Sequence, residues 1–248
     1  MEFTRTITSL LICSLLTFTF SSCQKSDQEE DDPKDEEEIN TFTDSRDSKQ
    51  YKWVKIGTQT WMAENLAYLP SVNSPSDESS SDPRYYVEAY AGTNVADARA
   101  TDNYKVYGVL YNWPAASAAC PTGWHLPSDD EWKVLEIYLG MSQSEADEIG
   151  GLDRGTDEGS KLAGNSSLWD PGLLKSNASF GSSGFQALPG GFLYTGSFSG
   201  TGRYGKWWSS TLYYSRVIDR ALYYSNAHSG RGDESHKEYG YSIRCIKD

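Results

Sequence analysis

The densest group of residues that could do chemistry lies in residues 120–132, which read Cys-Pro-Thr-Gly-Trp-His-Leu-Pro-Ser-Asp-Asp-Glu-Trp. His125 could serve as a general base, and the carboxylates of residues 129–131 could form an acid–base pair. The chain has no Gly-x-Ser-x-Gly elbow and no His-x-x-x-His pair, which are motifs of common hydrolases. His125 lies between Trp124 and Leu126. We therefore expect a buried, hydrogen-bonded histidine rather than a catalytic base.

The three carboxylates have a structural explanation. Ser128-Asp-Asp-Glu131 is a capping box, in which the serine and the glutamate satisfy backbone donors at a helix N-terminus. Asp129 and Asp130 would also interact well with the positive end of the helix dipole. Apolar residues follow at helical spacing, and Gly140 is placed to end the helix.

A second acidic group, Asp153, Asp157 and Glu158, lies in a glycine-bearing loop. Its oxygen atoms are ligands that calcium accepts. Glutamate stands where an EF-hand loop would carry its turn glycine, so we interpret the segment as a solvated acidic loop. These three residues remain candidates for a calcium site, and no other cofactor is expected.

Paired tyrosines are the main feature that indicates binding. Neighbouring side chains on a strand point to opposite faces, so one tyrosine of a pair can pack in the core while the other is exposed. An exposed tyrosine offers an apolar face and a hydroxyl to a sugar or a protein. The candidate ligand-binding residues are Tyr213, Tyr214, Arg216, Tyr223, Tyr224 and Asn226. The integrin-type tripeptide Arg231-Gly-Asp233 is expected in a polar loop, where such a tripeptide often arises by chance.

The N-terminus is typical of an exported lipoprotein. Residues 1–22 combine Arg5 with an apolar run that ends in Phe20-Ser-Ser-Cys23, and the run is shorter than the ~20 residues of a membrane-spanning helix. Small residues before a cysteine indicate a bacterial lipobox, so Cys23 is the expected lipidation site and anchor to an outer membrane. The alternative is a plain secretory signal with an incidental cysteine.

An acidic block follows this cysteine. Residues 24–39 carry nine acids against Lys25 and Lys34, which accounts for −7 of the chain's net charge of −13 and leaves −6 for the rest. Such a segment is too polar and too charged to fold, so residues 23–48 are predicted to be a disordered tether. An acidic stretch after a lipidated cysteine resembles the surface-export signal of Bacteroidetes-type lipoproteins. The rest of the chain has no basic patch, which argues against nucleic acid as a partner.

Residues 49–248 are predicted to form one α+β domain. A hairpin is expected over residues 53–62, and short helices are expected near Pro114 and after Ser128 and Ser142. A long glycine-rich stretch to about Gly205 shows few regular signals. Three antiparallel strands are expected at residues 207–214, 217–224 and 239–246.

Two cysteines remain in this domain, Cys120 and Cys245. Outside the cytoplasm two such cysteines usually pair, and this bond would stabilise the fold by up to about 4–5 kcal/mol on the chain-entropy model. Two free thiols or a metal pair is the alternative. The three histidines of the chain show no zinc-like spacing with these cysteines.

Several motifs occur in order along residues 51–248. They are Ile56-Gly-Thr-Gln-Thr-Trp-Met-Ala-Glu-Asn-Leu66, Tyr107-Gly-Val-Leu-Tyr-Asn-Trp113, Cys120-Pro-Thr-Gly-Trp-His-Leu-Pro127, Gly184-Phe-Gln-Ala-Leu-Pro-Gly-Gly191, Trp207-Trp-Ser-Ser-Thr211 and Ser242-Ile-Arg-Cys-Ile246. In these the chain resembles the Fibrobacter succinogenes major paralogous domain (FISUMP) family, secreted or lipidated proteins of Bacteroidetes and relatives without an assigned activity. The family is more distantly similar to the C-type-lectin-like fold of formylglycine-generating enzymes. That resemblance implies a C-type-lectin-like domain with short helices in its N-terminal half and a C-terminal antiparallel sheet.

The leading hypothesis is a noncatalytic, adhesin-like binding module on the cell surface, which takes an extracellular glycan or protein. A structural subunit of a surface or pilus-like assembly is the alternative, and a divergent extracytoplasmic enzyme is a third. Formylglycine-type chemistry uses cysteines near a metal, whereas both cysteines of this domain are expected to be structural.

Overall fold

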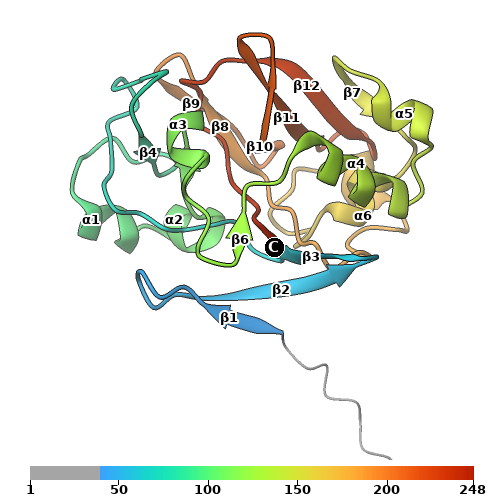
Figure 1. The fold of residues 1–248 in the computed structure, drawn as a ribbon, viewed down its shortest axis with the longest axis horizontal. Helices are drawn as coiled ribbons and strands as arrows, with labels where there is room; N and C mark the ends of the chain where they lie inside the picture. Colours follow the sequence, from blue (N-terminus) through green and yellow to red (C-terminus); the bar gives the residue numbers. More distant parts are fainter. Residues whose placement is uncertain (1–39) are drawn as a thin grey trace, which may run out of the picture. The chain divides into compact units, whose positions relative to one another are not determined.

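The computed structural model describes residues 40–248, which lie within one compact unit (Figure 1). The predicted signal peptide, Cys23 and the acidic block of residues 24–39 lie outside the described residues. Strand β1 (Thr41–Thr43) falls inside the range assigned to the tether. The fold therefore begins before residue 49, because Phe42 stacks on Trp124 with ring centroids 4.4 Å apart.

A five-stranded sheet contains both ends of the described chain. Its order is β1-β2-β3-β13-β6, with β2 at Gln50–Ile56, β3 at Gln59–Met62, β13 at Ile246–Lys247 and β6 at Trp124–His125. The expected hairpin is confirmed, and Gly57 takes a positive φ of 61° at its turn. Strand β13 lies between β3 and β6, which places Cys245 next to the segment that carries Cys120. The predicted disulfide joins them, with Cα atoms 5.9 Å apart.

A six-stranded sheet forms the other half of the fold (Figure 1). Its order is β7-β12-β11-β10-β8-β9, with β7 at Gly151–Arg154, β8 at Gly190–Tyr194, β9 at Ser197–Thr201, β10 at Tyr204–Tyr213, β11 at Arg216–Tyr223 and β12 at Ser229–Ser235. Its neighbours are antiparallel except for β10 and β8.

Two of the three expected C-terminal strands are confirmed as β10 and β11. The third prediction was wrong for most of its length: β12 at residues 229–235 pairs with β11, while residues 240–242 form isolated bridges and Ile246 begins β13. Gly230 and Gly232 are the reason that β12 was not recognised, because glycine is rare inside strands. The expectation of an irregular glycine-rich middle was also incomplete, since β7, β8 and β9 lie there.

Short helices and a two-stranded ribbon cover the sheets. The helices are α1 (Val95–Ala100), α2 (Asp102–Tyr107), α3 (Trp113–Ala116), α4 (Asp129–Tyr138), α5 (Gln143–Asp147), α6 (Glu158–Leu162) and α7 (Leu173–Ser176). The ribbon pairs β4 (Tyr85–Tyr86) with β5 (Leu110–Tyr111). Both predicted capping boxes, at Ser128 and Ser142, are present. Among the described residues no helix has the length and apolar character needed to cross a bilayer.

The core is built from large aromatic side chains. The tryptophans with almost no exposed surface are Trp61, Trp132, Trp169, Trp207 and Trp208. Helix α4 packs Trp132 against Trp61 and Phe185, with ring centroids 4.9 and 5.7 Å apart. Helices and mostly antiparallel sheets share these contacts, so the domain is a mixed, sheet-rich fold, which agrees with the predicted α+β class.

Candidate functional site

An open groove of about 1310 Å³ is bounded by the strands of the six-stranded sheet and by residues 236–241. It is larger than the ~300–1,000 Å³ of most small-molecule sites. Its walls are aromatic, and the aromatic side chains are Phe192, Tyr194, Phe198, Tyr204, Tyr213, Tyr214, Tyr239 and Tyr241. A groove of this size and lining can accommodate an extended ligand.

The rings of the walls are fixed by contacts with one another. Phe192 meets Tyr204 edge to face at 5.8 Å and Tyr241 at 6.4 Å, and Tyr194 lies 4.8 Å from Tyr239 between ring centroids. Aromatic pairs at such distances stabilise each other beyond the area that they bury. These five rings are therefore held in place before a ligand binds.

The floor of the groove is a polar network. Lys206 of β10 places its Nζ 3.3 Å from Oδ2 of Asp219 on β11 and 3.3 Å from the hydroxyl of Tyr241. The hydroxyl of Ser235 donates a 2.7 Å hydrogen bond to Oδ1 of Asp219 and lies 2.9 Å from the Tyr241 hydroxyl. The Asp219 side chain is 2% exposed, whereas that of Lys206 is 20% exposed. Lys206 is thus the member of the network that a ligand can reach.

The charge of this lysine is held by its neighbours. Burial opposes the ammonium, but Asp219 and Tyr241 outweigh it and hold the pKa of Lys206 above its usual range. Burial and the neighbouring Tyr194 raise the pKa of Tyr239 to about 12. At neutral pH the groove therefore offers a charged Lys206 and the neutral hydroxyl of Tyr239.

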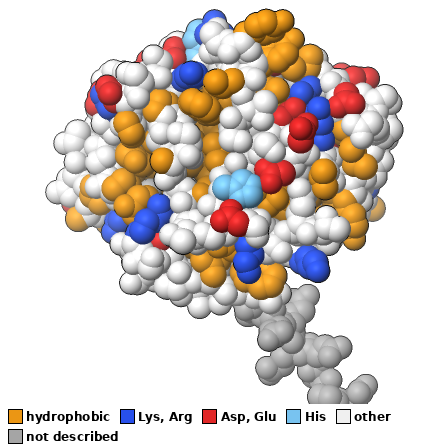
Figure 2. All heavy atoms as spheres, viewed as in Figure 1, with side chains coloured by type: hydrophobic (Ala, Val, Ile, Leu, Met, Phe, Trp, Pro, Cys, Tyr) orange, Lys and Arg blue, Asp and Glu red, His pale blue; other side chains and the backbone are white. Residues whose placement is uncertain are grey.

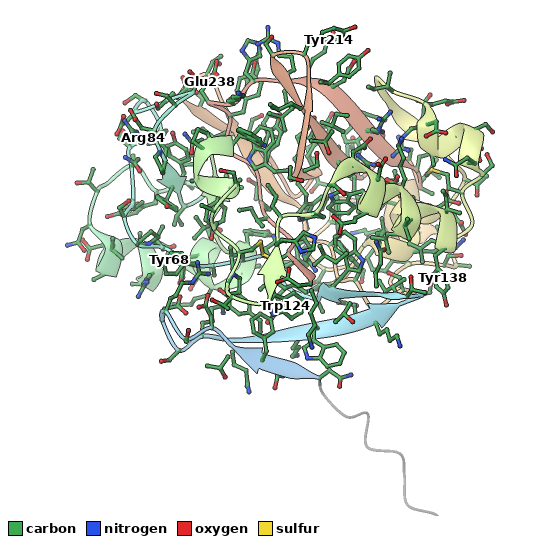
Figure 3. All side chains as sticks on the ribbon, viewed as in Figure 1. Tyr68, Arg84, Trp124, Tyr138, Tyr214 and Glu238 are labelled. Carbon is green, nitrogen blue, oxygen red and sulfur yellow. A yellow bond between two sulfur atoms is a disulfide. The ribbon has the colours of Figure 1, made fainter. Side chains whose placement is uncertain are left out.

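Two hairpin tips on the groove carry strained residues. Thr195, between β8 and β9, has a φ of 44°, and Tyr214, between β10 and β11, has a φ of 54°. Turns with a positive φ favour glycine or asparagine, and a bulky or β-branched residue there is an outlier. Tyr214 is also 87% exposed, and Figure 3 shows it at the tip of its hairpin. Outliers of this kind gather at functional sites.

The six candidate ligand-binding residues divide into two groups. Tyr213, Tyr214 and Arg216 line the groove, whereas Tyr223, Tyr224 and Asn226 are not among its lining residues. The second group lies at the far end of β11, roughly 20 Å away along the strand. This second group is therefore not part of the groove lining.

The second group of candidates makes structural contacts of its own. The Tyr223 ring stacks on Tyr204 at 4.3 Å, and the guanidinium of Arg203 lies 4.9 Å from the centre of the Tyr224 ring. Asn226 donates a hydrogen bond to the carbonyl of Leu152. Tyr223 thus supports a groove wall from beside it.

The acidic candidates for a calcium site do not converge. Asp157 pairs with Lys161 at 2.6 Å, and Asp153 is exposed on β7. Glu158 is buried, and its Oε2 accepts the backbone N–H of Thr156 at 2.7 Å. The interpretation as a solvated loop was therefore wrong for Glu158. Within residues 40–248 no three His, Cys, Asp or Glu side chains form a group suited to a metal ion.

His125 lies between two carboxylates. Its Nδ1 is 2.7 Å from Asp248 and its Nε2 is 2.8 Å from Glu131. Burial opposes the charged ring, but these carboxylates raise the pKa of His125 above its usual value. The expected hydrogen bonding is confirmed, but the expected burial is wrong, because 42% of the side chain is exposed. Ser128 donates to Glu131 rather than to His125, so this cluster holds no serine–histidine pair.

Asp129 of the capping box and Arg231 of the integrin-type tripeptide belong to one buried ionic cluster. The carboxylate of Asp129 contacts Arg231 at 2.6 Å and Arg220 at 2.8 Å, and Arg220 also reaches Glu136 at 2.9 Å. Asp129 therefore does more than favour a helix dipole. The loop expected around the integrin-type tripeptide is also wrong, because Arg231 lies in β12 and is 6% exposed.

Sequence reasoning missed most of the groove. The unrecognised residues include Phe192, Tyr194, Lys206, Asp219, Tyr239 and Tyr241. A usable signal existed, since Phe192 and Tyr194, and again Tyr239 and Tyr241, are two residues apart and so point to one face of an extended chain.

Comparison with known proteins gives one match. The model of the Fibrobacter succinogenes major domain matches residues 54–247, a range that includes the groove and both cysteines of the disulfide. No curated protein and no solved structure matches the chain. The chain therefore belongs to the Fibrobacter succinogenes major domain family.

Proposed function

We propose that this protein is a noncatalytic, adhesin-like surface lipoprotein that binds an extracellular glycan in the groove. One observation carries the proposal: aromatic walls stand around a polar floor in a groove large enough for several sugar units. Pyranose rings present C–H faces that stack on aromatic rings and hydroxyls that pair with polar groups. The groove supplies both kinds of partner, as ligand sites generally do.

The location belongs to the same proposal. Cys23 would carry the lipid that anchors the protein to the outer membrane, and the acidic block after it would direct the domain to the cell surface. The domain carries a net charge of −6, and acidic and basic side chains are intermixed on the face in Figure 2. This distribution favours a glycan or a protein over nucleic acid as the partner.

We further propose that the fold is C-type-lectin-like. The helix that starts after Leu126-Pro-Ser and the disulfide between Cys120 and the terminal Arg-Cys segment support this assignment. It rests on an analogy of fold, so it adds nothing to the choice of ligand.

No catalytic step is assigned to the groove. Lys206 would need a neutral amine to act as a nucleophile, and Asp219 stabilises its charged form. The domain's two cysteines are joined in a disulfide, so neither offers a thiolate.

A glycan array tests the proposal. The full chain is applied with calcium and with chelator, beside a variant that carries Tyr194→Ala and Tyr239→Ala. Tyr138→Ala is the matched control, because Tyr138 is 64% exposed and does not line the groove. Binding that the double variant loses and the control keeps would support the proposal. A blank array from folded, disulfide-bonded protein would contradict it, and a structural subunit of a surface assembly would be the next function to test.

A further inference from the structure

We infer that the groove selects uncharged oligosaccharides, and that Lys206 donates a hydrogen bond to a sugar hydroxyl while Asp219 positions the lysine and neutralises it. The inference rests on the proposed function and specifies its ligand class. It starts from the two charges at the floor of the groove.

An ammonium group has three N–H donors. Among residues 40–248, Asp219 and the Tyr241 hydroxyl are the side-chain acceptors within hydrogen-bond distance of Nζ of Lys206. One donor therefore remains for a ligand. Nζ also lies 4.7 Å from the centre of the Tyr241 ring and 5.7 Å from that of Phe192, so the donor is presented between aromatic surfaces.

The carboxylate of Asp219 is built into the site. It accepts hydrogen bonds from Ser235 and Lys206. Its cross-strand partner is Gly232, where a Cβ would collide with Oδ1 of the carboxylate. A buried carboxylate with these partners is a fixed counter-charge, and it removes the attraction that a lone lysine would have for an anion.

The other charges of the groove do not restore that attraction. Arg216 lines the groove together with the acidic side chains of Asp233 and Glu234. Two basic and three acidic side chains therefore line the groove, which disfavours sulfated or uronic-acid sugars. An uncharged ligand with hydroxyls and apolar ring faces fits both the polar floor and the aromatic walls of the groove.

The test compares sugars of different charge. The full chain is titrated with cellohexaose, xylohexaose, mannohexaose, maltohexaose and chitohexaose, and with hexagalacturonate and a heparin hexasaccharide. At least one neutral sugar should bind at least about tenfold more tightly than either acidic one. Its affinity should change less than about twofold between about 50 and 500 mM NaCl, because no net charge is paired on binding.

Two variants test the separate roles of Lys206 and Asp219. Lys206→Met should weaken neutral binding about tenfold, the effect of losing a hydrogen bond from a charged donor. Asp219→Asn keeps the shape but exposes the lysine's charge, so hexagalacturonate should bind about tenfold more tightly than it does to the unchanged protein, and this gain should disappear in high salt. Asp130→Asn makes the same charge change at an exposed site outside the groove and should leave both classes of sugar unaffected. Circular dichroism and melting temperature establish that each variant is folded.

The outcomes separate the two proposals. Tighter binding of an acidic sugar to the unchanged protein would overturn the neutral selectivity and leave glycan binding intact. Equal behaviour of folded Asp219→Asn and Asp130→Asn would overturn the role of Asp219. If Lys206→Met unfolds, Lys206→Met with Asp219→Asn replaces it, because that pair leaves no unpaired buried charge. The absence of binding to every sugar would overturn the proposed function together with this inference.

Discussion

Gly232 provides the space that the carboxylate of Asp219 occupies. The two residues are cross-strand partners on β12 and β11, and a Cβ at position 232 would overlap Oδ1 of Asp219. The same carboxylate accepts the hydrogen bond of Ser235 and faces Lys206. A glycine that weakens the strand thus permits the polar floor of the groove.

The first prediction follows from this contact. Gly232→Ala should lower the free energy of unfolding by about 1–3 kcal/mol, because it displaces a buried hydrogen-bonded carboxylate. Urea unfolding measures the change. In an Asp219→Ala background the same substitution should cost much less, since the atoms that it would meet are gone. Equal costs in the two backgrounds would contradict the steric relationship.

The second prediction concerns the strained tip of the β10–β11 hairpin. Tyr214 has a φ of 54° and is 87% exposed. Its backbone conformation therefore costs conformational energy in the folded state, and its side chain makes few packing contacts that could offset this cost. Tyr214→Gly should therefore raise stability by about 0.5–1 kcal/mol and weaken glycan binding. Thermal melts and ligand titrations of the same samples check both effects. A loss of stability would contradict the backbone strain at Tyr214, and unchanged binding would remove Tyr214 from the site.

The third prediction is a pH dependence. Asp248 and Glu131 raise the folded-state pKa of His125 above the usual value of 6.5. The ion pairs should contribute fully below about pH 6.5 and be lost as the pH rises through the folded-state pKa. The contribution should stay below about 1 kcal/mol, because the side chain is 42% exposed.

Urea unfolding at pH 5.5 and pH 8.5 measures this dependence. The free energy of unfolding should differ less between the two pH values in His125→Gln than in the unchanged protein. The other titrating groups are present in both proteins, so the change reports on the histidine alone. Identical pH dependence in the two proteins would show that these ion pairs contribute nothing to stability.

Local chemistry explains which parts of the fold could be predicted. Both capping boxes are short-range patterns, and the structure has them at Ser128 and Ser142. Strand β12 could not be recognised, because its glycines make room for residues of neighbouring strands: Gly230 lies against Leu152 of β7, and Gly232 lies against Asp219 of β11. The groove could not be predicted for the same reason, because Lys206, Asp219 and Tyr241 come together only after the strands have paired. Tyr213, Tyr214 and Arg216 could be named as binding candidates from the sequence, because the paired tyrosines and the arginine are close neighbours in the chain.

The last prediction separates two neighbouring aspartates that the sequence treats alike. Both lie in the first turn of α4, yet the side chain of Asp129 is 6% exposed and that of Asp130 is 91% exposed. Burial alone would raise the pKa of Asp129, but Arg231 and Arg220 hold it at about 2. Its contribution to stability is therefore present above about pH 4 and is lost as the pH falls towards 2.

Asp129→Asn should lower the free energy of unfolding at pH 7 by about 3–5 kcal/mol, because two buried guanidinium groups lose their shared carboxylate. Asp130→Asn should change it by less than about 0.5 kcal/mol, as expected for an exposed residue. Urea unfolding of the two variants side by side compares them directly, since each loses one negative charge from the same helical turn. Similar effects would mean that the helix dipole accounts for both residues, whereas a large difference assigns Asp129 to the cluster that joins α4 to β11 and β12.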